Sequence, residues 1–105
     1  SIGVHTGYKG LAMYASSKGA LEAFSKDTAR EWGPMGIRSN VVVPGFMATA
    51  MSSTLTDDQR NKIYARTSLK AATSIRSVAE TVAFLLSEKA ESITGQNIHV
   101  DNGTI

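Results

Sequence analysis

The sequence predicts an α/β fold in which helices alternate with the strands of a parallel sheet. Two short apolar runs, over residues 37–43 and 96–100, have the length and composition of buried strands. One helical segment, residues 12–32, precedes the first run, and two more, at 56–66 and 77–86, lie between the runs. The order helix, strand, helix, helix, strand is typical of a parallel sheet with helical crossovers.

The first predicted helix is long and follows a loop. The eleven residues before it contain three glycines and show no apolar period, so we expect them to form that loop. Residues 12–32 are expected to be helical, with Leu21 and Phe24 on the apolar side. Gly33–Pro34 predicts the end of this helix, because glycine suits the position after a helix and proline cannot continue one.

The first predicted strand is a β-branched run between Gly36 and Pro44. Asn40 lies inside this run. A buried amide must find hydrogen-bond partners, so we expect Asn40 to have a structural role and to bond neighbouring backbone. Residues 44–55, rich in small side chains and methionine, are expected to form a loop.

Two capping-box patterns predict where the next helices begin. Thr56 is followed three residues later by Gln59, and Ser77 is followed by Glu80. Three apolar residues are expected on one face of the second of these helices: Val78, Val82 and Leu85. The final strand follows at residues 96–100.

The composition is that of a soluble globular protein and argues against several classes of function. The 105 residues amount to one domain or less, with 42% hydrophobic and 19% charged residues. The net charge of +2 comes from scattered basic residues, which does not indicate nucleic-acid binding. Without cysteine there is no disulfide or thiolate site, as in many cytoplasmic proteins. No apolar run is long enough to cross a membrane, and His5 and His99 are too isolated to predict a metal site.

The chain is expected to be the second half of a larger doubly wound domain. Both predicted strands are apolar at most positions, so each needs cover on both faces. Two parallel strands do not make a stable sheet by themselves. The chain also begins at Ser1 without an initiator methionine, so we expect the natural N-terminus to lie upstream.

Tyr14 and Lys18 are the strongest candidates for chemistry. Four residues apart on a helix, their side chains lie on one face. A phenol exchanges protons poorly near neutrality, but a nearby ammonium favours the phenolate form. The pair is therefore a plausible proton-transfer device. The same spacing also fits an amphipathic helix with a half-buried tyrosine and a solvated lysine.

Three blocks of sequence resemble the C-terminal half of a short-chain dehydrogenase/reductase. In the first, a serine stands thirteen residues before Tyr14, and Lys18 follows. Residues 37–49 read Ile-Arg-Ser-Asn-Val-Val-Val-Pro-Gly-Phe-Met-Ala-Thr, and residues 93–103 read Ile-Thr-Gly-Gln-Asn-Ile-His-Val-Asp-Asn-Gly. Residues 55–60, Leu-Thr-Asp-Asp-Gln-Arg, look most like the 3-oxoacyl-[acyl-carrier-protein] reductase branch. The resemblance covers essentially the whole chain and implies a partial Rossmann-type domain.

The resemblance implies roles for the first block. Tyr14 would be the general acid in carbonyl reduction, or the base in alcohol oxidation. Lys18 would favour phenolate and bind the ribose hydroxyls of the nicotinamide cofactor, NADP or NAD. Ser1 would hydrogen-bond the substrate carbonyl.

The second block would lie at the nicotinamide. Pro44 and Gly45 follow a predicted strand, and ligands of open α/β sheets bind beyond the carboxyl ends of strands. Glycine there also lets the backbone come close to a cofactor. The resemblance adds a backbone contact at Met47 and a hydroxyl contact at Thr49. A plain turn with Met47 as core filler is the alternative.

Two other patterns are set aside. Gly3, Gly7 and Gly10 do not have the spacing of the family's phosphate-binding glycine loop, which we expect upstream together with the active-site asparagine. Asn102-Gly103-Thr104 matches a glycosylation sequon, which we treat as coincidence.

The resemblance implies an NAD(P)-dependent oxidoreductase of the cytoplasm, acting in fatty acid biosynthesis on 3-oxoacyl groups carried by acyl carrier protein. Homotetramers or dimers are implied, with the helix at 12–32 in the subunit interface. Met35 is a departure, because some acyl-carrier reductases have a basic residue there that docks the acidic carrier. A sugar, steroid or small-alcohol dehydrogenase remains an alternative. A non-catalytic fragment that can only associate is another.

Overall fold

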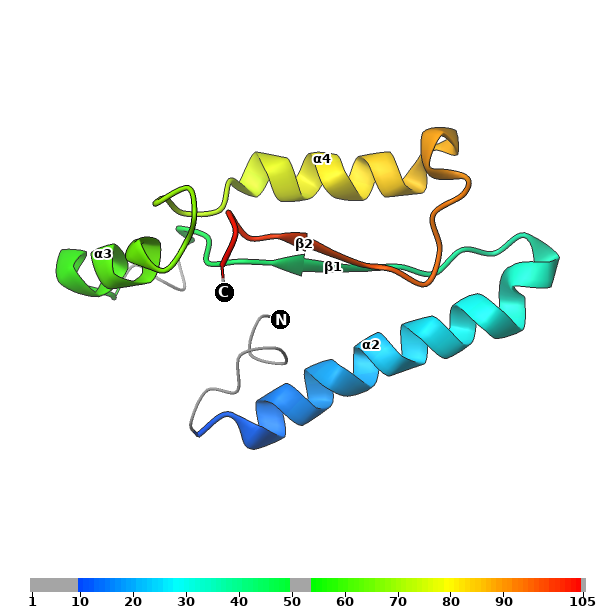
Figure 1. The fold of residues 1–105 in the computed structure, drawn as a ribbon, viewed down its shortest axis with the longest axis horizontal. Coiled ribbons are helices and arrows are strands. Elements are labelled where there is room, and N and C mark those ends of the chain that lie inside the picture. Colours follow the sequence, from blue (N-terminus) through cyan, green and yellow to red (C-terminus); the bar gives the residue numbers. More distant parts are fainter. Residues whose placement is uncertain (1–9, 50–53, 105) are drawn as a thin grey trace.

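The chain folds into three layers, with a two-stranded parallel sheet between two helices (Figure 1). This computed structural model describes residues 10–49 and 54–104. Helix α2 covers one face of the sheet and helix α4 covers the other, while the shorter α3 lies beyond one end of it. The predicted α/β class and the parallel sheet are confirmed.

Helix α2 spans Ala12–Trp32, as predicted. A 3₁₀ turn, η1, continues it over Gly33–Met35, and the left-handed residue that ends the helical path is Gly36, at φ +78°. Gly33 keeps right-handed helical angles. The prediction placed the end of the helix correctly but assigned the special glycine wrongly, because proline fits the first turn of a 3₁₀ helix as well as it ends an α-helix.

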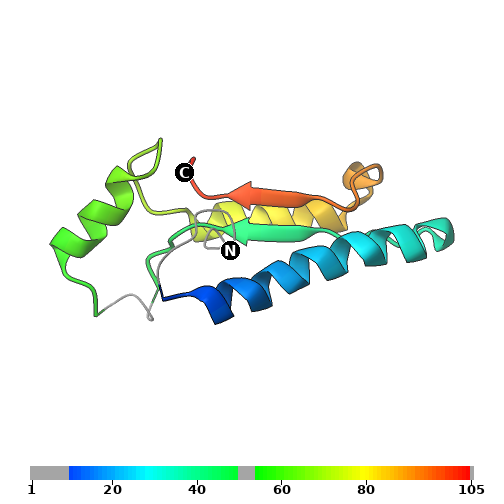
Figure 2. The same cartoon turned by 60° about the horizontal axis from the view of Figure 1, so that its bottom comes forward.

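The buried face of α2 is not the predicted apolar one. Leu21 and Phe24 are 56% and 70% exposed, whereas Glu22, Ser25 and Ala29 are buried. The latter three follow each other at the spacing of one helical face. Small side chains at two of these positions let α2 approach the narrow sheet closely (Figure 2).

The sheet is formed by β1, Val41–Pro44, and β2, Asn97–Val100. They are parallel and in register from Val41 opposite Asn97 to Pro44 opposite Val100. At the centre Val43 is fully buried. Parallel strands end at the same edge of a sheet, so the loops that follow β1 and β2 lie side by side.

Residues 37–40 are not part of the strand, contrary to the prediction. Asn40 shows why: its Nδ2 donates to the carbonyl of Ile93 at 2.9 Å, and its Oδ1 accepts from the backbone N–H of Gln96 at 3.1 Å. The Ser39 N–H likewise donates to Oγ1 of Thr94 at 3.0 Å. Side chains therefore replace a sheet ladder here, and the expected structural role of Asn40 is confirmed.

Arg38 extends this polar connection to α4. Its guanidinium donates to the carbonyls of Leu85, Ile93 and Ser87, at 2.8, 3.2 and 3.5 Å. The last carbonyls of a helix lack intrahelical partners and carry partial negative charge, so an arginine is a fitting partner for them.

Helix α3 spans Asp57–Ala65 and has the predicted capping box. The Oγ1 of Thr56 accepts from the N–H of Gln59 at 3.2 Å, and Oε1 of Gln59 accepts from the N–H of Thr56 at 2.8 Å. Both ends of the box are therefore satisfied within one turn.

Helix α4 spans Ile75–Leu86 and is followed by a 3₁₀ turn, η3, at Glu88–Ala90. The predicted cap was wrong: Ser74 is the N-cap, and its Oγ accepts from the N–H of Ser77 at 3.1 Å. Ser77 is thus inside the first turn. Of the predicted apolar face, Leu85 is buried, Val78 is half-buried and Val82 is exposed.

Candidate functional site

A hollow of about 330 Å³ lies between α2 and β1. Three residues of the predicted site line it: Tyr14, Lys18 and Pro44. Leu21, Glu22, Val41 and Val42 complete its walls. The volume falls at the lower end of the range found for small-molecule sites.

Tyr14 and Lys18 contact one another on the surface of α2. The Nζ of Lys18 lies 5.4 Å from the centroid of the Tyr14 ring, within the range of a cation–π interaction. The phenol side chain is half-exposed, at 48%. The carbonyl of Tyr14 also accepts the Ser17 hydroxyl at 2.8 Å, a bond within the helix. The predicted sharing of one helical face is therefore confirmed.

Glu22 is a residue of the hollow that the sequence reasoning missed. It is only 9% exposed and follows Lys18 by four residues, on the same face as Tyr14. Its spacing of four residues from Lys18, equal to that between Tyr14 and Lys18, could have predicted its place on this face. The hollow is therefore lined by one acidic side chain, Glu22, and one basic side chain, Lys18.

The predicted cofactor segment, Pro44–Thr49, which begins with the last residue of β1, enters the site only in part. Pro44 lines the hollow, whereas Gly45, Met47 and Thr49 do not belong to its walls. Phe46 turns toward α3, where its ring lies 6.1 Å from that of Tyr64 at an interplanar angle of 57°. Met47 is partly buried and Thr49 is exposed.

Gly45 is closely surrounded by the chain itself. A Cβ atom at this position would lie 2.7 Å from Oγ1 of Thr73 and 2.8 Å from Cα and Cβ of Asp101. From the sequence, we expected glycine at position 45 because the backbone there would approach a cofactor. The packing of the protein already requires glycine at this position.

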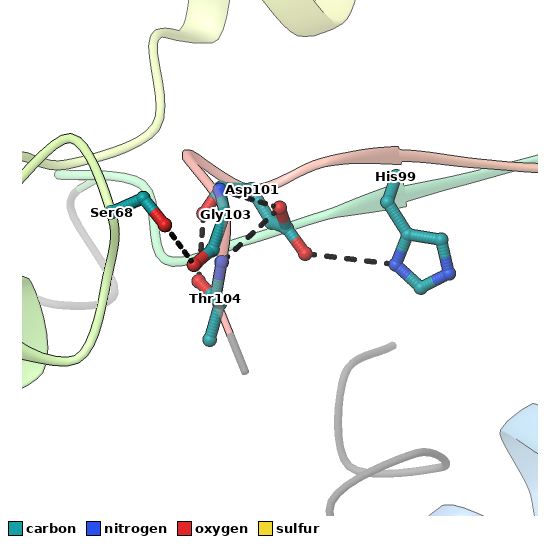
Figure 3. Close-up of polar contacts among 5 residues, drawn as sticks. All are labelled: Ser68, His99, Asp101, Gly103 and Thr104. Atoms are coloured by element: carbon teal, nitrogen blue, oxygen red, sulfur yellow. Dashed lines mark hydrogen bonds and ion pairs between the residues drawn. The ribbon is translucent and has the colours of Figure 1, made fainter.

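A compact polar turn follows β2 at the same edge of the sheet (Figure 3). The Oδ1 of Asp101 accepts from the backbone N–H groups of Gly103 and Thr104, at 2.9 and 3.4 Å. The carbonyl of Gly103 accepts the Ser68 hydroxyl at 3.2 Å. His99 Nδ1 lies 3.6 Å from Oδ2 of Asp101. None of these residues was singled out as a site residue.

Other predicted features fall outside the described residues. Ser1 and His5 lie there, so the geometry given above does not include the predicted serine of the site. Within residues 10–49 and 54–104, no group of three or more acidic, histidine or cysteine side chains could hold a metal ion. None of the helices in that part of the chain is long and apolar enough to cross a membrane.

Comparison with known proteins identifies the family. A family model described as enoyl-(acyl carrier protein) reductase matches residues 1–104. The chain belongs to the short-chain dehydrogenase/reductase family. Among curated short-chain dehydrogenase/reductases, it is 44% identical over 97 residues to the 3-oxoacyl-[acyl-carrier-protein] reductases FabG of Salmonella typhimurium and Escherichia coli. It is 40% identical over 97 residues to the protein of the same name from Staphylococcus epidermidis.

These matches cover 92% of this chain and 40% of each of these relatives. The predicted similarity to 3-oxoacyl-[acyl-carrier-protein] reductases is therefore confirmed over most of the chain. The family description and the names of the relatives refer to two different reductions, of an enoyl and of a 3-oxoacyl group.

Proposed function

We propose that the protein carrying this chain is an NAD(P)-dependent oxidoreductase that reduces a carbonyl group to a secondary alcohol, or catalyses the reverse oxidation. One observation carries the proposal. In a chain of this family, Tyr14, Lys18 and Pro44, the last residue of β1, line a single hollow. Proton donor and cation are thus next to the carboxyl end of a parallel strand, where ligands of α/β sheets bind.

The chemistry of the lining residues fits a nicotinamide cofactor. In the part of the chain that the structure describes, the phenol oxygen of Tyr14 and the ammonium of Lys18 make no hydrogen bond to another residue, so both can serve a ligand. An ammonium has three donors, enough for two ribose hydroxyls. When bound, NAD(P)H supplies the hydride that reaches the carbonyl carbon.

Each residue of the chain then has a defined task. Tyr14 donates its proton to the carbonyl oxygen as the alcohol forms. Lys18 favours the phenolate that remains and binds the ribose. Ser1 donates a hydrogen bond to the carbonyl oxygen. Pro44, Gly45, Met47 and Thr49 contact the nicotinamide side of the cofactor.

The favoured substrate is a 3-oxoacyl thioester on acyl carrier protein, supported by the names of the relatives and their 40–44% identity to this chain. A sugar, steroid or small-alcohol substrate is the alternative, and Met35, in place of a basic docking residue, is compatible with it. Turnover of 3-oxoacyl carrier protein against free 3-oxoacyl, sugar and steroid substrates distinguishes them. The choice between NADP and NAD follows from the same assays with each cofactor.

We further propose that residues 1–105 are one part of a Rossmann-type domain whose dinucleotide-binding half lies elsewhere in the protein. The chain spans only 40% of the length of its relatives. Among the described residues, β1 pairs with another strand along one edge only. Its second edge and the exposed apolar residues of α2 are sites where other parts of a domain, or a second subunit, can pack. The parent is expected to be a cytoplasmic homotetramer or dimer.

Replacing Tyr14 with phenylalanine in the complete protein tests the reaction. The ring and its contact with Lys18 remain, and only the proton donor is lost. We expect kcat to fall by roughly 100-fold or more, the usual contribution of a general acid, with the dissociation constant of NAD(P)H unchanged. Y64F, which removes a phenol hydroxyl in α3, is the matched control. Turnover retained in Y14F would refute the mechanism.

A further inference from the structure

The segment after β1 is held at one point by two other parts of the chain. Around Gly45, Thr73 comes from the connection between α3 and α4, and Asp101 comes from the turn after β2. The gaps of 2.7 and 2.8 Å that a Cβ atom would have to these residues leave no room for one. The backbone N–H of Gly45 also donates to the carbonyl of Val100 at 3.0 Å. The position of Asp101 therefore determines where Gly45 can lie.

Hydrogen bonds within the turn at 101–104, which Asp101 begins, hold Asp101 in place. Its Oδ1 accepts from Gly103 and Thr104, and its carbonyl accepts the Thr104 hydroxyl at 2.7 Å (Figure 3). Aspartate side chains commonly stabilise such turns by bonding backbone N–H groups two and three residues on. The Asp101 side chain is 10% exposed, so water competes little for these bonds.

The turn is also fastened to the segment that carries Thr73. The Nδ2 of Asn102 donates to the carbonyls of Ala71 and Ala72, at 2.9 and 3.0 Å. The N–H of Leu69 donates to the carbonyl of Asn102 at 3.1 Å.

The connection that carries Thr73 is also hydrogen-bonded to Phe46, the residue after Gly45. The N–H of Thr73 donates to the carbonyl of Phe46 at 2.8 Å. Three parts of the chain therefore contact one another: the turn at 101–104, the connection at 67–73, and Gly45 with Phe46.

We propose that Asp101 is a positioning residue, whose carboxylate holds the turn at 101–104 against Gly45 and thereby places the segment Pro44–Thr49 beside Tyr14 and Lys18 for cofactor binding. This inference rests on the proposed function. Asp101 acts through Gly45 and is not part of the hollow.

The oxygen acceptor of Asp101, rather than its charge, carries this role. The 3.6 Å between Nδ1 of His99 and Oδ2 is too long for a good hydrogen bond. Oδ1, in contrast, has two N–H donors. Asparagine retains an oxygen at this position and alanine does not, so the two substitutions separate the two roles.

The test compares D101A, D101N and the control E91A in the complete protein. Glu91 is exposed and follows η3, at the opposite end of the sheet from Pro44–Thr49 (Figure 1). Amide hydrogen exchange is measured over residues 44–49 and 12–32, and the dissociation constant of NAD(P)H is measured by its fluorescence. T104V, which removes only the hydroxyl bond within the turn, is a milder variant should D101A fail to fold.

In D101A we expect faster exchange at the amide of Gly45, unchanged exchange in α2, and a dissociation constant raised roughly tenfold, the scale of one lost buried hydrogen bond. T104V should change both in the same direction by less. D101N and E91A should resemble the unmodified protein.

Unchanged exchange at 44–49 in D101A would overturn the inference, as would faster exchange without loss of affinity. An effect of D101N equal to that of D101A would overturn it too, because charge would then be responsible. A failure of the proposed function can be distinguished from a failure of this inference. In that case the unmodified protein would bind neither NADH nor NADPH, and Asp101 would have no cofactor site to position.

Discussion

At the residue scale, the pair on α2 could be predicted and its surroundings could not. The spacing of Tyr14 and Lys18 places them on one helical face whatever the tertiary structure, and the structure has them in contact. The sequence analysis did not select Glu22, because a carboxylate in the middle of a helix is usually solvated and its burial arises from tertiary packing.

Lys18 is expected to act mainly through cofactor binding. In K18M the long apolar stem remains while the three N–H donors are lost. We expect the dissociation constant of NAD(P)H to rise at least tenfold, in line with the loss of a charged hydrogen bond, and kcat to fall as well. Fluorescence titration and steady-state kinetics measure the two effects.

K26M is the control for that substitution, since Lys26 lies two turns further along α2 and lines a different hollow. If K18M bound the cofactor as tightly as the unmodified protein, the ribose contact would be wrong.

At the element scale, sequence patterns predicted the ends of helices correctly where the hydrogen bonds that stabilise those ends join residues close in sequence. The capping box at Thr56 is complete within four residues, so the sequence alone predicts it. The start of α4 was misjudged because Ser74 and Ser77 are both good caps and the glutamate at position 80 favoured the later one. The predicted strand was too long because the backbone N–H of Ser39 and the side chain of Asn40 bond residues more than fifty positions away, which no local pattern reveals.

The cap of α4 gives a prediction about stability. S74A removes the acceptor of the Ser77 N–H and should lower the free energy of unfolding of the complete protein by about 1 kcal/mol. S77A, in the first turn, should change it by less than about 0.5 kcal/mol. Denaturant unfolding measures both, and equal losses would contradict the assignment of Ser74 as the cap.

At the scale of the whole molecule, the class of fold followed from the order of elements, but the buried side of α2 did not. A helix in a larger assembly can have an apolar stripe that a small sheet leaves uncovered, and hydrophobic periodicity does not say which neighbour covers it. Leu21 and Phe24 are such residues here.

The 105-residue chain by itself is expected to hold no cofactor. Its hollow contains the Tyr14–Lys18 pair but no glycine loop for a pyrophosphate, which we expect elsewhere in the parent. Titration of this chain with NADH and NADPH should therefore show no saturable binding in the micromolar range, with the complete protein as the positive control. Tight stoichiometric binding would contradict the proposal that the chain is part of a larger dinucleotide-binding domain.

The bridge between Thr67 and Thr104 has a practical consequence for work on this protein. It ties the end of the described chain to the connection that also holds Phe46. A bulky label attached at Thr104 would therefore lie against the connection at 67–73, and is expected to disturb the contact of that connection with Phe46. A label attached to Glu88, Lys89 or Glu91, which are exposed at the opposite end of the sheet, avoids that interference.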